Sequence, residues 1–129
     1  MTSPSLLSRR PIVPAERLIF ALDVPSPATA RQLVETLGDA VRFYKIGLEL
    51  FMAGGYFELI EWLRACDKKV FVDLKFFDVP ETVRSAVRQL KPYDASFATV
   101  HGNDAILRAA VEAARETGAD LGILAVTAL

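Results

Sequence analysis

The regular spacing of strand-like segments constrains the fold of this chain more than any other feature. Five short runs rich in Val, Ile, Phe and Leu begin at intervals of 25, 27, 26 and 25 residues, near Leu18, Phe43, Val70, Ser96 and Leu121. An interval of this length suits one strand followed by one crossover helix, repeated along the chain. The sequence therefore predicts a parallel sheet of five strands that are connected by helices.

The segments between these runs carry the start signals of helices. In chain order the signals are Ser26-Pro27, Gly54-Gly55, Pro80, and either Asn103 or Asp104. Serine and asparagine cap helix N-termini, and proline is favoured at the first helical position. Apolar residues recur at helical spacing after each signal, which predicts four helices with one core-facing stripe each.

Composition is typical of one globular domain. Of the 129 residues, 52% are hydrophobic and 24% are charged. The 15 basic and 16 acidic residues nearly balance, so no nucleic-acid partner is expected. No apolar run approaches the roughly 18 residues of a membrane span, and the single Cys66 suits a reducing cytoplasm. Residues 1–16 lack the apolar core of a secretory signal, so we expect an N-terminal extension there and a single domain over 17–129.

Three ionisable residues stand at the end of the third strand-like run. Asp73, Lys75 and Asp78 follow directly after the apolar residues 70–72. Because side chains alternate along a strand, Asp73 and Lys75 are expected to point to the same face. Burying charges is costly unless they are paired, and a carboxylate beside an ammonium meets that condition. Taken alone, the pattern also fits an ion pair with a purely structural role.

Other strands place polar side chains at the same edge of the predicted sheet. Asp23 closes the first run, Lys45 lies inside the second, and His101 closes the fourth. Ligands of parallel α/β folds bind at the carboxyl ends of the strands, whether the sheet is open or closed. A lysine inside a buried strand needs a carboxylate partner, and the third strand offers Asp73.

A chain of alternating charges is the expected result. It would run from Lys45 through Asp73 and Lys75 to Asp78, with a net charge near zero. Such an array could keep Lys75 protonated and hold it in place. A fixed ammonium of this kind suits a general acid that delivers a proton to carbon.

These segments resemble the orotidine 5′-phosphate decarboxylase family. Asp73 to Thr82 reads Asp-x-Lys-x-x-Asp-Val-Pro-x-Thr, which is similar to the family signature. Ala21-Leu22-Asp23 and Lys45-Ile46-Gly47 match the same family, and the resemblance extends from about Arg17 to Leu129. It implies a homodimeric (β/α)₈ barrel that decarboxylates orotidine 5′-monophosphate to UMP in pyrimidine synthesis, without a metal or an organic cofactor.

The resemblance implies a role for each matching residue. Lys75 would donate the proton to C6 of the pyrimidine, and Asp73 would lie beside the substrate carboxylate and stress it. Lys45 would bridge Asp73 and a ribose hydroxyl, and Asp23 would hold a ribose hydroxyl.

A second group of matching residues is expected to act across the dimer. Asp78 and Thr82 would reach into the active site of the other subunit, where Val79 would supply an apolar wall. His101 is usual in the family at this strand end, but the resemblance assigns it no catalytic role.

Two architectures fit the repeat of strands and helices. A doubly wound sheet of the flavodoxin type suits the length, whereas a (β/α)₈ barrel needs about 250 residues. The family motifs favour the barrel. The expected class is therefore α/β, with parallel (β/α) units of a TIM-type barrel truncated after the fifth strand. Since the family's pyrimidine- and phosphate-binding groups lie beyond this point, the chain alone is not expected to act at a family-like rate.

Three alternative functions stay open. A flavodoxin-like phospho-acceptor would use Asp23 and Asp73 near magnesium, but the lysine it predicts at the end of the fifth strand is not found. A magnesium-dependent sugar-phosphate decarboxylase of the same superfamily would be similar around Asp73 and Lys75, but typically has an acidic residue in place of Lys45. A non-catalytic half-barrel that assembles through its exposed strand edges is the third.

Overall fold

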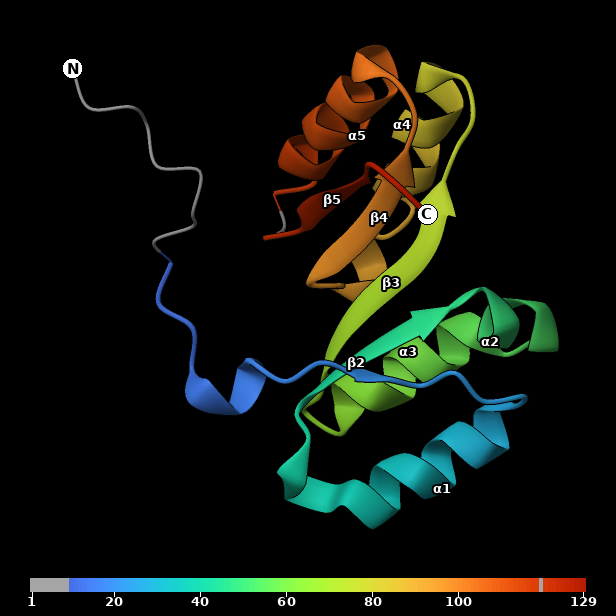
Figure 1. The fold of residues 1–129 in the computed structure, drawn as a ribbon, viewed down its shortest axis with the longest axis vertical. Helices are drawn as coiled ribbons and strands as arrows, with labels where there is room; N and C mark the ends of the chain where they lie inside the picture. Colours follow the sequence, from blue (N-terminus) through green and yellow to red (C-terminus); the bar gives the residue numbers. More distant parts are fainter. Residues whose placement is uncertain (1–9, 119) are drawn as a thin grey trace.

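The computed structural model describes residues 10–118 and 120–129, and within them it has one parallel sheet covered by helices (Figure 1). The strands are β1 (Phe20–Ala21), β2 (Phe43–Gly47), β3 (Lys69–Phe76), β4 (Phe97–His101) and β5 (Gly122–Val126). The helices are α1 (Pro27–Leu37), α2 (Leu48–Ala53), α3 (Tyr56–Ala65), α4 (Pro80–Arg88) and α5 (Asp104–Glu116), with short 3₁₀ turns η1 (Pro14–Glu16), η2 (Gly38–Ala40) and η3 (Lys91–Tyr93).

Successive side chains of each strand point alternately to the two faces of the sheet, and helices cover one of these faces. The residues of β2, β3 and β4 that are buried against the helices are Tyr44, Ile46, Val70, Val72, Ala98 and Val100. The residues between them point to the opposite face, and these are Phe43, Lys45, Phe71, Asp73, Phe97 and Thr99. The helices therefore pack on one face of the sheet, and the charged residues lie on the other.

The order of the strands decides between the two predicted architectures. Neighbours in the sheet follow the chain, β1-β2-β3-β4-β5, and every pair is parallel. A flavodoxin-type sheet has the order 2-1-3-4-5 and helices on both faces. A sequential order with the helices on one face is how (β/α) barrel units wind. The prediction of parallel barrel units is confirmed, and the flavodoxin alternative is wrong.

Helices begin where the sequence signals predict. The Ser26 Oγ accepts a hydrogen bond from the backbone N–H of Thr29 at 3.1 Å, at the start of α1. The Asn103 Oδ1 accepts one from the N–H of Ile106 at 3.1 Å, at the start of α5. Each side chain satisfies a backbone donor that the first turn of the helix leaves free. Of the two residues proposed to cap α5, Asn103 is therefore the one that does so.

The short helix α2 was not predicted. It has six residues, between β2 and the glycine pair at 54–55. Six residues are fewer than two turns, so no helical periodicity can be recognised in them. Leu50 is buried, whereas Leu48 and Met52 are 62% and 75% exposed. The helix therefore presents apolar side chains to solvent just after the carboxyl end of β2.

An aromatic cluster lies on the open face, toward the amino ends of the strands. The rings of Phe43 and Phe97 stack with their centroids 5.7 Å apart, and Phe71 meets Phe97 edge-on at 5.8 Å. A Cβ at Gly122 would come within 2.7 Å of the Phe97 ring, so this position of β5 requires glycine. On the open face, the aromatic cluster therefore lies toward the amino ends of the strands, and the charged residues lie next to it, nearer the carboxyl ends.

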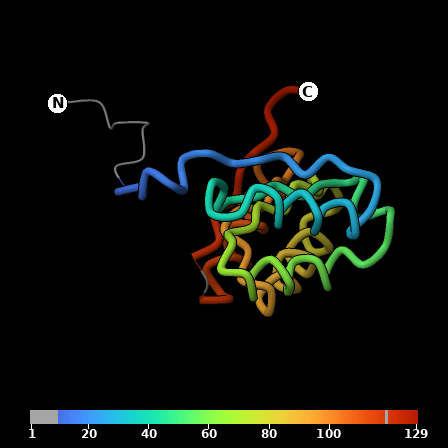
Figure 2. The backbone as a smooth tube through the Cα atoms, turned by 90° about the horizontal axis from the view of Figure 1, so that it is seen from below, coloured from blue at the N-terminus to red at the C-terminus, as the bar shows by residue number. Residues whose placement is uncertain are grey.

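The described part of the predicted N-terminal extension contacts the rest of the fold. Residues 1–9 lie outside the described residues, and the domain boundary at residue 17 stays a prediction. Glu16 pairs with the Lys69 Nζ at 2.7 Å, at the amino end of β3. Figure 2 shows this segment running along the outside of the fold, while the residues after β5 extend away from the helices. None of the helices in residues 10–118 and 120–129 has both the length and the apolar content needed to cross a bilayer.

Lys68 offers a test of the packing around the first (β/α) unit. It is 8% exposed, and its Nζ donates to the carbonyl oxygens of Gly38 at 2.7 Å and Val41 at 2.9 Å. Lys68→Met keeps the aliphatic stem but leaves both carbonyls without this donor. We expect the free energy of unfolding, measured in urea, to fall by about 1–3 kcal/mol. The control Lys69→Met removes a half-exposed ion pair and should cost less than about 1 kcal/mol. Equal losses in the two variants would contradict the stabilising role assigned to the two hydrogen bonds of Lys68.

Candidate active site

The charged residues of β2 and β3 meet on the open face of the sheet. The Asp73 Oδ2 lies 3.4 Å from the Lys45 Nζ, and its two oxygens lie 3.0 and 3.1 Å from the Lys75 Nζ. The side chain of Asp73 is 11% exposed, against 27% for Lys45 and 43% for Lys75. A nearly buried carboxylate is therefore held between two ammonium groups, and Lys75 is the one more open to solvent. The predicted contact between Lys45 and Asp73 is present.

A threonine of β4 completes the contacts of this carboxylate. The Thr99 Oγ1 donates a hydrogen bond to the Asp73 Oδ1 at 2.7 Å and accepts one from the backbone N–H of Lys75 at 2.9 Å. The sequence did not single out Thr99. The available signal was a polar residue two positions before His101, which places both on the open face of an otherwise apolar strand.

The backbone of β3 is irregular at this point. Lys75 has a φ of +48°, in the left-handed region that non-glycine residues seldom adopt. The register between β3 and β4 also shifts between Val72 and Phe76. Irregularities of this kind re-aim side chains near functional sites. Here the N–H of Lys75 finds its acceptor in the side chain of Thr99.

The pKa of Asp73 lies below its ordinary value. Burial alone would raise this pKa, because it withdraws water from the carboxylate. The hydrogen bond from Thr99, then the hydrogen bond and charge of Lys75 and the charge of Lys45, favour the ionised form and outweigh burial. Asp73 therefore stays ionised at a pH where an ordinary aspartate takes up a proton.

This lowered pKa predicts how stability depends on pH. Since Asp73 binds its proton less readily in the folded chain than in the unfolded chain, its ionised form stabilises the fold above the ordinary aspartate range. That contribution is lost as the pH falls through the folded-state pKa. We expect the free energy of unfolding, measured in urea from about pH 6 to pH 3, to fall more steeply for the wild type than for Asp73→Asn. Parallel curves for the two proteins would contradict this assignment.

Asp78 lies at the rim rather than inside the array. Its Oδ1 accepts a hydrogen bond from the Val79 backbone N–H at 2.7 Å. Within the part of the chain that the structure describes, its carboxylate pairs with no lysine. The sequence predicted an array of alternating charges over four residues, from Lys45 to Asp78. In the described residues the ion pairs connect the first three, Lys45, Asp73 and Lys75, and Asp78 is not part of the array.

The rim also holds the other residues expected to act across a dimer. Val79 is 62% exposed, and Thr82 is exposed on the first turn of α4. A groove of about 340 Å³ between the end of β3 and α4 is lined by Lys75, Asp78 and Thr82, among others. The side chains of Asp78 and Thr82 are therefore accessible beside Lys75.

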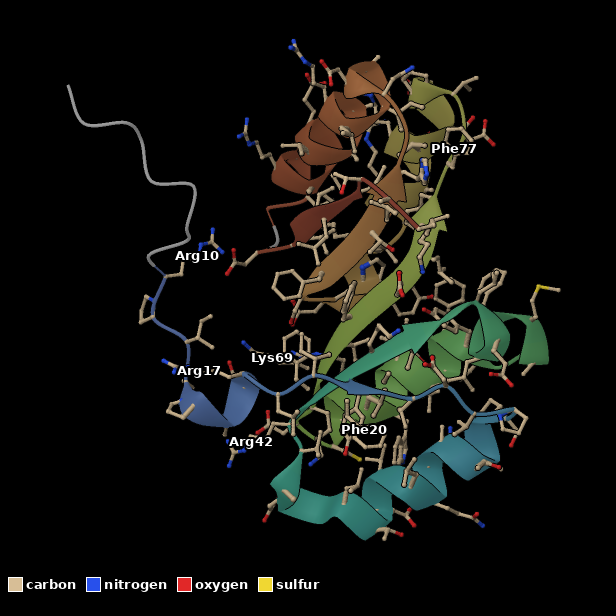
Figure 3. All side chains as sticks on the ribbon, in the orientation of Figure 1. Arg10, Arg17, Phe20, Arg42, Lys69 and Phe77 are labelled. Carbon is tan, nitrogen blue, oxygen red and sulfur yellow. The ribbon has the colours of Figure 1, made fainter. Side chains whose placement is uncertain are left out.

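Asp23 and His101 lie at the ends of β1 and β4. Asp23 follows β1 by two residues, and Ala21 of that strand is in register with Lys45. The Asp23 side chain is exposed, and within the described ranges its carboxylate makes no hydrogen bond or ion pair. The His101 ring packs against Phe77 with the centroids 5.1 Å apart, and its buried Nδ1 has no hydrogen-bond partner among the described residues. Figure 3 shows Phe77 beyond the tip of β3, at the opposite end of the strand from Lys69.

The oxygens of Asp73 are already engaged. Oδ1 contacts Lys75 and Thr99, and Oδ2 contacts both lysines. Among the described residues, no group of three or more His, Cys, Asp or Glu side chains could hold a metal ion. What the arrangement offers chemically is a fixed, solvent-accessible ammonium beside an ionised carboxylate.

Comparisons with known proteins show which family the sequence resembles. A model of the orotidine 5′-phosphate decarboxylase / HUMPS family matches residues 16–129. The orotidine 5′-phosphate decarboxylase of Methylococcus capsulatus is 64% identical over 126 residues, which are 98% of this chain and 50% of that protein. The enzyme of the same name from Xanthomonas axonopodis pv. citri is 52% identical over 120 residues, which are 92% of this chain and 48% of that protein.

Solved structures show the same likeness. The crystal structure of orotidine 5′-phosphate decarboxylase from Lactobacillus acidophilus has a TM-score of 0.79 and 32% identity, covering 88% of this chain and 54% of that one. The enzyme from Methanocaldococcus jannaschii, complexed with the inhibitor BMP, has a TM-score of 0.73 and 28% identity, covering 84% of this chain and 51% of that one. The chain spans about half the length of the curated relatives it matches. With its parallel (β/α) units and its array of Lys45, Asp73 and Lys75, the chain belongs to the orotidine 5′-phosphate decarboxylase / HUMPS family.

Proposed function

We propose that this chain supplies the charged part of an active site that decarboxylates orotidine 5′-monophosphate to UMP, a step of pyrimidine synthesis. The observation that carries the proposal is the Asp73 carboxylate held between Lys45 and Lys75, on a fold whose relatives are named for this reaction. The site lies where parallel (β/α) folds bind their ligands, at the carboxyl ends of the strands. We further infer a cytoplasmic enzyme, in keeping with a single, exposed cysteine.

Lys75 is the residue proposed to carry the chemistry. Loss of CO₂ breaks the bond between C6 and the carboxylate and leaves the electron pair on C6. A fixed ammonium stabilises the negative charge that develops there and then donates its proton to C6, which gives UMP and a neutral amine. Solvent returns the proton to Lys75, whose side chain is 43% exposed. This chemistry uses no cofactor.

Asp73 and Lys45 are proposed to prepare the site for this step. Asp73 stays ionised, so a substrate carboxylate bound beside it meets a like charge. That repulsion is released as CO₂ departs, which lowers the barrier because the stress is greater in the bound substrate than in the transition state. Lys45 holds Asp73 from the other side and is proposed to contact a ribose hydroxyl, and Asp23 to bind a ribose hydroxyl as well.

We also propose that the enzyme is a homodimer. Exposed apolar side chains follow the carboxyl ends of β2 and β3 along the chain, and they are Leu48, Met52, Phe77 and Val79. Burying apolar side chains of this kind against another protein surface would favour association. In such a dimer Asp78 and Thr82 would act in the partner's active site, with Val79 as an apolar wall. The support for this is that all three side chains are exposed at the rim.

The magnesium-dependent alternative is less well supported. The Lys45 ammonium lies 3.4 Å from the Asp73 carboxylate. A relative with an acidic residue in place of Lys45 would instead have a second negative charge beside this carboxylate. A second positive charge at this carboxylate disfavours a divalent cation. No observation favours the half-barrel alternative over an enzyme, so decarboxylation is the function that we carry forward.

A chimera tests the proposed function. The chain is joined to the part of the Methylococcus capsulatus enzyme that the sequence match leaves uncovered, and release of CO₂ from carboxyl-labelled orotidine 5′-monophosphate is measured. We expect the chimera to form UMP. The 129-residue chain, measured in parallel, is expected to fall far short of that rate. A folded chimera that forms no UMP would contradict the proposed function, and a chain that matches the chimera would contradict the second expectation.

A further inference from the structure

The hydroxyl of Thr99 connects the two residues of the charged array that differ most in exposure, Asp73 and Lys75. Asp73 is nearly buried, while the Lys75 side chain is 43% exposed and extends from an irregular stretch of backbone. The Thr99 Oγ1 donates to the Asp73 Oδ1 at 2.7 Å and accepts from the Lys75 N–H at 2.9 Å. One buried atom therefore contacts both the carboxylate and the backbone of the proposed proton donor.

Packing alone does not explain a threonine at this position. Its neighbours in β4, Ala98 and Val100, point toward the helices, whereas the Thr99 side chain lies on the open face beside Asp73 and is 7% exposed. A hydroxyl in such a place is costly to bury unless it is hydrogen-bonded, whereas valine would fill nearly the same volume at no such cost. Both hydrogen bonds that satisfy the hydroxyl are made with residues of the charged array, Asp73 and Lys75. The hydroxyl therefore serves these two residues rather than the packing of β4.

The contact to Lys75 compensates for the irregular strand. At a φ of +48°, Lys75 has a conformation that persists only where its surroundings stabilise it. Because the register with β4 shifts at this point, the Lys75 N–H relies on a side chain for its acceptor. A Lys75 released from this bond could relax toward ordinary strand geometry, which would carry its ammonium to another place.

We propose that Thr99 is a positioning residue, which fixes the carboxylate of Asp73 and the backbone of Lys75 in the geometry that decarboxylation requires. The inference rests on the proposed function, since it names a further residue of the same site. Thr99 acts through Asp73 and Lys75 and is not itself a proton donor to the substrate. The electrostatics point the same way: after burial, which raises the pKa of Asp73, the hydrogen bond from Thr99 is the strongest of the influences that lower it.

Two variants of Thr99 separate the hydroxyl from the methyl group. Thr99→Val keeps the shape and removes both hydrogen bonds, while Thr99→Ser keeps the hydroxyl and removes the methyl group. Thr36→Val is a matched control, because the Thr36 Oγ1 donates to the Gln32 carbonyl in α1, away from the array. If Thr99→Val does not fold, Thr99→Ala replaces it as the variant without the hydroxyl, with the same measurements and the same expected results.

The primary measurement is an NMR titration of the Asp73 carboxyl carbon in the 129-residue chain, with hydrogen exchange of the Lys75 amide. We expect Thr99→Val to raise the pH at which Asp73 titrates and to speed exchange at Lys75. Thr99→Ser should restore both, and Thr36→Val should change neither. An unchanged Asp73 titration in Thr99→Val, or an equal change in Thr99→Ser, would overturn the inference. Neither readout needs turnover, so this result is independent of whether the proposed function holds.

Kinetics of the chimera then connect the geometry to the reaction. We expect Thr99→Val to lower kcat by about 10- to 100-fold with a smaller change in KM, because the misplaced groups act mainly in the transition state. Thr99→Ser should recover most of the loss. A Thr99→Val chimera with wild-type kcat would overturn the positioning role, whereas a wild-type chimera without activity would count against the proposed function alone.

Discussion

Replacing Lys75 with methionine in the chimera is expected to lower kcat for UMP formation by at least about 10⁴-fold, because one ammonium is asked to supply two effects. Proton donation by a positioned group contributes about 10²–10⁴, and electrostatic stabilisation of a developing charge about 10²–10³. Methionine keeps much of the aliphatic stem, so the loss reports the charge and the proton rather than packing. The measurement is CO₂ release from labelled substrate under single-turnover conditions.

Two controls make the Lys75 result specific. Lys69→Met removes an ammonium from the opposite end of the same strand, where Lys69 pairs with Glu16, and should leave kcat within about twofold because it touches no part of the array. Affinity for UMP should change little in Lys75→Met, since the effect belongs to the transition state. A Lys75→Met enzyme within tenfold of the wild-type kcat would remove Lys75 from the proposed mechanism.

Mixing two impaired variants of the chimera is expected to restore activity, if Asp78 acts across the dimer. Lys75→Met and Asp78→Asn should each be impaired, the second by about 10²-fold because it disturbs the placement of the reacting groups. In a mixed dimer, one site combines an intact Lys75 from one subunit with an intact Asp78 from the other. Since half of randomly mixed dimers are mixed and each holds one such site of two, about a quarter of wild-type activity should return.

The structure supports testing Asp78 in this way. Its carboxylate accepts a hydrogen bond from the adjacent Val79 N–H and pairs with no lysine within the described residues. If Asp78 acts within its own chain, both sites of the mixed dimer stay defective and no activity returns. Sedimentation of each variant before mixing shows whether both form dimers, so an absence of recovery among intact dimers would contradict action across the dimer.

Much of the local structure follows from neighbouring residues. Ser26 caps α1 because its hydroxyl reaches a backbone donor three residues later, and Asn103 does the same for α5. The contact of Lys45 with Asp73 could be expected because a lysine in a buried strand needs an opposite charge. The short helix α2 escaped prediction because six residues carry too little periodicity.

The sequence by itself determined where the strands and most helices begin, which residues alternate onto one face, and which charges had to find partners, because these depend on short-range geometry and on the cost of burying a charge. Only the tertiary structure decided the order β1-β2-β3-β4-β5, the left-handed Lys75, the placement of Asp78 at the rim and the contacts of Thr99. The hydroxyl of Thr99 meets a carboxylate 26 residues away in the chain. Such a contact depends on the register between two strands and on where β3 becomes irregular, and both are set by packing across the whole sheet.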